Sequence, residues 1–158
     1  MTAIQLNLLG GEQTARTTDD WYTPKWIFDA LGLTFDLDVA CPPEGPINVP
    51  AARWYTAADD GLAQPWTGRV WMNPPYSKPK PWVERFLEHG NGIALLPLTS
   101  SARWVLQLWE SKARVIVLIS VKFMKSDGTT KGAYPGTIGV WAIGDDNIKA
   151  LAKLGKVR

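Results

Sequence analysis

Four consecutive residues, Asn73-Pro74-Pro75-Tyr76, combine hydrogen-bond acceptors with an aromatic ring. Because proline has no backbone N–H and holds the preceding residue extended, the Asn73 side-chain oxygen and the Pro74 carbonyl can converge as two fixed acceptors. An exocyclic amino group can donate both of its hydrogens to this pair, which makes its nitrogen a better nucleophile. The Tyr76 ring provides a face on which a planar ring can stack. We therefore predict a site that activates a ring amino group; a simple strand-ending turn is the alternative, since Asn and Pro are common turn residues.

Alternating apolar strands and amphipathic helices surround this motif. This alternation predicts a parallel sheet that is covered on both faces. We expect a compact α/β, doubly wound (Rossmann-like) sheet with a late antiparallel hairpin strand. The expected helices are 25–32, 79–90, 101–112 and 145–155, and the expected strands are 33 to about 38, 52–57, 68–73, 92–99, 114–120 and 136–144.

Two polar residues fall at the ends of expected strands, where ligands bind in such sheets. Asp38 lies at the end of the first expected strand, and Asn73 ends the 68–73 strand. The helix at 25–32 has an apparent start and stop: Thr23 can cap it, Pro24 suits its first turn, and Gly32 suits its end.

Length and composition limit the kind of protein. A chain of 158 residues is long enough for one domain, here 19–158, preceded by an arm at 1–18. A single cysteine and a single histidine exclude an internal disulfide and the usual zinc ligand sets, so we expect no metal. The N-terminus lacks the features of a signal peptide, which favours a reducing cytoplasm. The net charge of +2 permits nucleic-acid binding without arguing for it.

The sequence resembles the phage-encoded, S-adenosylmethionine-dependent DNA adenine-N6 methyltransferase family over roughly residues 20–145. The matching motifs are "NPPY" at Asn73 to Tyr76, "YTP" at Thr23 and Pro24, "DVAC" at Asp38, Ala40 and Cys41, and "DDGL" at Asp60. The resemblance implies a methyltransferase sheet with S-adenosylmethionine as the cofactor and adenine in double-stranded DNA as the substrate. The target base must then be flipped out of the helix to reach the site.

The resemblance also implies roles for the cofactor-binding residues. Asp38 would pair with the α-ammonium of the cofactor, and the Thr23 hydroxyl would bond its carboxylate. Asp60 would accept a hydrogen bond from the cofactor's adenine amino group. Asp36 competes with Asp38 for the first role, and Asp59 competes with Asp60 for the last.

A second set of residues is expected to meet the DNA. The segment 121–136 reads either as a solvated loop or as a nucleic-acid-facing hairpin that carries Lys122, Phe123 and Lys125. In the second interpretation Phe123 lies on the face of the target base opposite Tyr76. Lys78 and Lys80 would contact phosphates beside the entrance.

Other acceptors remain open at this point. The same four-residue motif serves other planar amino groups, so an RNA base or a protein glutamine amide is the alternative substrate. A catalytically weak DNA-binding module is the alternative from outside the enzymes. The oligomeric state is not predicted.

Overall fold

The computed structural model describes residues 22–98, 102–125 and 127–158, so the expected arm at 1–18 lies outside the described residues. Within these residues, no helix is long and apolar enough to cross a membrane. The elements in chain order are α2 (Lys25–Leu31), β1 (Phe35–Asp38), β2 (Ala51–Trp54), the 3-10 helix η1 (Ala57–Asp59), β3 (Val70–Met72), α3 (Lys80–His89), β4 (Gly92–Pro97), α4 (Arg103–Glu110), β5 (Arg114–Ile119), β6 (Lys122–Met124), β7 (Thr130–Ala133), β8 (Thr137–Ile143) and α5 (Asp145–Leu151).

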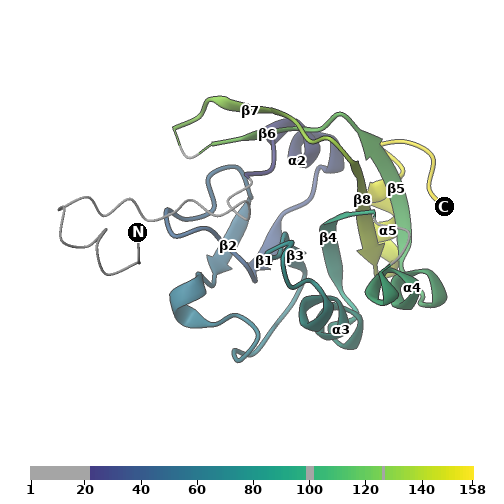
Figure 1. The fold of residues 1–158 in the computed structure, drawn as a ribbon. Coiled ribbons are helices and arrows are strands. Elements are labelled where there is room, and N and C mark those ends of the chain that lie inside the picture. Colours follow the sequence, from purple (N-terminus) through teal and green to yellow (C-terminus); the bar gives the residue numbers. More distant parts are fainter. Residues whose placement is uncertain (1–21, 99–101, 126) are drawn as a thin grey trace, which may run out of the picture.

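A six-stranded, mostly parallel sheet forms the centre of the fold (Figure 1). Its strand order is β2-β1-β3-β4-β8-β5, and β2, β1, β3 and β4 run parallel. Strand β8 is antiparallel to both of its neighbours, β4 and β5. The expected mixed α/β architecture and its late antiparallel strand are therefore confirmed.

Helices cover both faces of the sheet, as the sequence pattern predicts. Ile27 and Leu31 of α2 pack in one apolar cluster together with Leu151 of α5. Phe86 of α3 and Leu108 of α4 pack in the cluster on the other face. Strand β4 lies between the two clusters and all six of its residues are buried, which explains its uninterrupted apolar sequence.

The connections on the β2 side of the sheet are loops instead of long helices. Residues 39–50 join β1 to β2 without a helix, and only η1 lies in the chain between β2 and β3. The four prolines within 42–50 explain the first of these loops, because proline cannot donate helical hydrogen bonds. The carboxyl ends of β1 and β2 are thus bordered by irregular chain.

A separate two-stranded sheet, β6–β7, is formed by the part of the chain that connects β5 to β8. It lies next to α2 in Figure 1, and Phe123 of β6 packs in the same apolar cluster as α2. Tyr22 pairs with Met124 of β6 through two backbone hydrogen bonds. The expectation that 121–136 forms a hairpin is therefore confirmed, and its contact with nucleic acid stays a prediction.

The expected cap of α2 is wrong in one detail. The cap position is occupied by Pro24, and no side chain in the described part of the chain caps the helix. The Thr23 hydroxyl instead accepts a hydrogen bond from Asn73, which draws it away from the helix end. Gly32 does end the helix in the left-handed region, at φ 63°, as expected.

Candidate active site

The carboxyl ends of β1 and β3 bring three predicted site residues together. Asp38 is paired with Trp71 across these parallel strands, and Asn73 follows directly after the end of β3. The Asn73 amide donates to the Thr23 hydroxyl oxygen over 3.4 Å, although 50 residues separate them in the sequence. Thr23, Asp38 and Asn73 all line one cavity of about 230 Å³, called here the first cavity.

A second cavity of about 230 Å³ adjoins the first. The two share the lining residues Ala40, Cys41, Ala57 and Pro75. Asp60 lines the second cavity only. An elongated ligand can therefore extend from Asp38 at one end to Asp60 at the other.

Asp38 is a buried carboxyl group with little compensation from its surroundings. Its side chain is 1% exposed and accepts a hydrogen bond from the Ala40 N–H over 3.2 Å. Burial raises the pKa of Asp38 from 3.8 to about 7, against the lowering effect of that hydrogen bond. No salt bridge among the described residues involves Asp38. A ligand ammonium group would supply the missing positive charge.

Asp36 and Asp59, the alternatives to Asp38 and Asp60, both accept hydrogen bonds from the protein backbone. The carboxylate of Asp36 accepts from the backbone N–H of Arg69 over 2.7 Å, and Asp36 lines neither cavity. The carboxylate of Asp59 accepts from the backbone N–H and the hydroxyl of Thr56, and these bonds lower its pKa. These placements favour Asp38 and Asp60 as the ligand-facing residues.

The four-residue motif is divided between the cavities and the core. Asn73 lines the first cavity, Pro75 lines both, and Pro74 is buried. Tyr76 lines neither, and its hydroxyl is buried without a hydrogen-bond partner among the described residues. Burial, and then the neighbouring Tyr134, raise the pKa of Tyr76 well above its usual range.

Phe123 lies deeper than the base-stacking prediction assumes. Its side chain is 0% exposed, because the residue alternates inward from the exposed Lys122 on β6. Tyr134 makes edge-on contacts with both Tyr76 and Phe123, with ring centroids 6.2 and 6.0 Å apart. A base held between Tyr76 and Phe123 would require Tyr134 to move, so this pairing stays a prediction.

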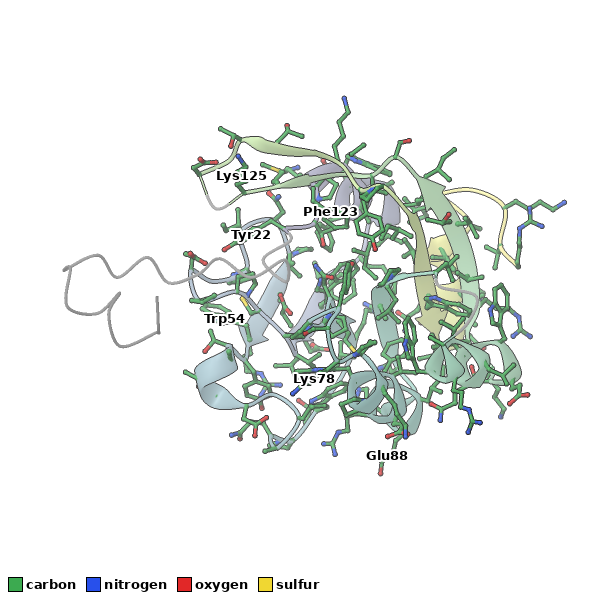
Figure 2. All side chains as sticks on the ribbon, viewed as in Figure 1. Tyr22, Trp54, Lys78, Glu88, Phe123 and Lys125 are labelled. Atoms are coloured by element: carbon green, nitrogen blue, oxygen red, sulfur yellow. The ribbon has the colours of Figure 1, made fainter. Side chains whose placement is uncertain are left out.

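The predicted phosphate-contacting lysines are all exposed, on two separate parts of the fold. Lys78 follows the four-residue motif, and Lys80 begins α3, where it lies 3.7 Å from Glu84. Lys122 and Lys125 belong to the β6–β7 hairpin region. Figure 2 shows Lys125 on the same side as Tyr22, whereas Lys78 lies nearer to α3.

Several residues at the first cavity were not predicted from the sequence. Tyr22 lines it and donates its hydroxyl to Glu44 of the proline-rich loop. Asn48 of the same loop also lines the cavity and donates to the Thr23 carbonyl over 2.9 Å. The polar residues of the proline-rich loop were the only hint in the sequence that this loop contributes to a site. Local sequence does not indicate that the loop folds back onto the first cavity.

Cys41 lines both cavities but is not a nucleophile in this state. Burial, and then the charges of Asp38 and Glu44, raise the pKa of the Cys41 thiol to about 12. The thiol thus stays protonated near neutral pH. In the part of the chain that the structure describes, no three His, Cys, Asp or Glu side chains gather to hold a metal ion.

A known protein family matches most of this chain. The family model described as DNA N-6-adenine-methyltransferase (Dam) matches residues 11–136. The chain belongs to this family. All candidate site residues predicted from the sequence lie within the matched stretch.

Two curated relatives carry the name DNA N-6-adenine-methyltransferase. The protein of Haemophilus phage HP1 (strain HP1c1) is 35% identical over 54% of this chain and 54% of its own length. The protein of Escherichia phage T1 is 32% identical over 62% of this chain and 44% of its own length. The chain thus spans about half the length of the curated relatives it matches.

The buried hydroxyl of Tyr76 leads to a stability prediction. Tyr76→Phe should raise the free energy of unfolding by about 1 kcal/mol or more, because it removes a buried polar group that lacks a partner. Methyl transfer should be little affected, since the ring is retained. Thermal melts and initial rates measure the two effects. A Phe variant that melts well below the parent would show that the hydroxyl makes a stabilising contact.

Proposed function

We propose that this chain transfers a methyl group from S-adenosylmethionine to the N6 amino group of adenine in double-stranded DNA. Membership of the family and the names of the two phage relatives support the reaction and the acceptor. The mostly parallel sheet with its antiparallel β8 supports a doubly wound, Rossmann-like methyltransferase fold. If the protein is phage- or prophage-encoded, it acts in the cytoplasm of a bacterial host.

One observation carries the proposal: Asn73 and the uncompensated carboxyl of Asp38 line the same cavity. An amino-acid ammonium held at Asp38 and a target amino group held at Asn73 would then meet in one cavity. The Thr23 hydroxyl oxygen accepts from Asn73, so its hydrogen remains to donate to the ligand carboxylate. The residues fit both ends of the methionine part of the donor.

The chemistry follows from the acceptors of the four-residue motif. When bound, the donor supplies an electrophilic methyl group on a sulfonium. The Asn73 side-chain oxygen and the Pro74 carbonyl would accept the two hydrogens of the target amine and so orient its nitrogen. Transfer would replace the S–CH₃ bond of the donor with an N–CH₃ bond, and the amine would then release a proton to water. Because the proton leaves after transfer, Asn73 needs no basic partner.

DNA binding would place the base at this site. An adenine inside the stack cannot reach Asn73, so the nucleotide must be flipped out of the duplex. The exposed Lys78, Lys80, Lys122 and Lys125 are available to contact phosphates on either side of the entrance.

The proposal is tested with labelled S-adenosylmethionine and three separate acceptors. Purified chain should label unmethylated duplex DNA, and nuclease digestion should release the label as N6-methyladenine. RNA and protein should stay unlabelled. Label in RNA or on a glutamine amide would show that the acceptor is not DNA. A chain that binds duplex DNA without labelling any acceptor would be a binding module instead of an enzyme.

A further inference from the structure

The second cavity has the chemical character of a site for a planar ring. Most of the side chains that line it are apolar, among them Val39, Pro75 and Trp82. Asp60 adds a carboxylate to this apolar wall. A heteroaromatic ring with an exocyclic amino group suits such a lining, because the ring buries apolar faces while the amino group donates to the carboxylate.

Trp82 packs against a second tryptophan at this cavity. Trp66 stacks on it with ring centroids 6.4 Å apart and an angle of 26° between the rings, yet Trp66 does not line the cavity. Trp82 therefore stands between Trp66 and the cavity. The Arg85 guanidinium lies 5.5 Å from the centre of the Trp66 ring, which supports the pair from outside.

The same aromatic pair is tied to the segment that carries Asp60. The Trp66 indole N–H donates to the Gly61 carbonyl over 2.8 Å. A Cβ atom at Gly61 would lie 2.1 Å from the Val39 carbonyl oxygen and 3.3 Å from the Trp82 ring. Only glycine permits this close approach, so the position of Asp60 and the position of Trp82 are fixed by one packed unit.

We propose that Trp82 is the aromatic wall of the second cavity on which the adenine ring of the methyl donor stacks, while Asp60 accepts from its amino group. The inference rests on the proposed function. It adds a residue that no motif in the sequence indicated: Trp82 lies on α3 and sets which ring system the donor site accepts.

The test measures the binding of S-adenosylhomocysteine, the product form of the donor, by calorimetry. Trp82→Leu should weaken binding about tenfold or more, within the range found for other ring-on-aromatic contacts. Trp82→Phe should stay within about threefold of the parent, because a ring remains. Trp26→Leu is the matched control: Trp26 is 49% exposed on α2, lines neither cavity, and should not change affinity.

A second measurement does not depend on a variant that folds. Photolysis of the parent protein with S-adenosylmethionine carrying an azide on its adenine ring should label the α3 peptide that contains Trp82. Equal affinities for the parent and Trp82→Leu, an equally large loss in Trp82→Phe, or a label on a peptide away from the second cavity would each overturn the inference. Failure of the parent to bind S-adenosylhomocysteine would overturn the proposed function as well.

Discussion

Replacing Asn73 with alanine is expected to reduce methyl transfer to DNA by about 100-fold or more, the size of effect seen when a single oriented hydrogen-bonding group is removed from an active site. The side-chain oxygen accepts from the target amine only when the base is in place, so its loss raises the barrier of the chemical step. Asn73 also donates to Thr23, the residue proposed to bind the donor carboxylate. Affinity for S-adenosylhomocysteine should therefore fall by only a few-fold.

Asn73→Asp is the matched variant. A carboxylate oxygen can accept the same bond from the amine, so part of the turnover should survive. Single-turnover rates with a duplex that contains the target site separate chemistry from product release. Wild-type turnover in the alanine variant would remove Asn73 from the mechanism. A loss of donor affinity as large as the loss of rate would make it a binding residue instead.

Replacing Asp38 with asparagine is expected to change stability and donor binding in opposite directions. The ionised carboxyl is buried at 1% exposure without a cation, so the amide should stabilise the ligand-free protein at pH 8. Each unit of pKa shift corresponds to about 1.4 kcal/mol, which predicts a melting temperature several degrees above the parent. Affinity for S-adenosylhomocysteine should fall about tenfold or more, because a charge-assisted bond to its ammonium is lost.

The pH dependence follows from the raised pKa of Asp38. Because the pKa is about 7 in the folded protein and near 3.8 in the unfolded chain, the folded state binds more protons between these values. The contribution of Asp38 to stability is therefore present below about pH 4 and is lost as the pH rises to about 7. The stability gap between the Asp38→Asn variant and the parent should grow over that window and then level off.

Donor affinity of the parent should show the opposite slope, rising up to about pH 7 as the carboxyl ionises. The Asp38→Asn variant should show no such rise. Chemical denaturation and calorimetry at pH 4 to 8 measure both quantities, and Asp36→Asn is a control on the same strand that lies outside both cavities. A parent protein whose affinity is flat over this range would place the ammonium elsewhere.

The sequence by itself determined most of the elements of the fold and the place of two candidate site residues in it. Its apolar periodicity predicted the buried strands of the main sheet, because local alternation and burial on both faces leave a direct signal, whereas the strand expected at 52–57 matches β2, which is largely exposed. It also placed Asp38 and Asn73 at strand ends, and parallel strands bring their carboxyl ends to one edge of a sheet. That Asp38 and Asn73 lie at one edge of the sheet was therefore predictable before any contact was known.

Only the tertiary structure decided which side chains face the cavities. Asp36 and Asp38 look alike in the sequence, but the backbone of Arg69 engages one carboxyl group while β1 and its neighbours bury the other. Phe123 is buried because its hairpin packs against α2, and Trp82 borders a cavity because Trp66 stacks behind it. In each case the direction and burial of a side chain depend on packing between segments that are distant in the chain, and local sequence patterns carry no record of that packing.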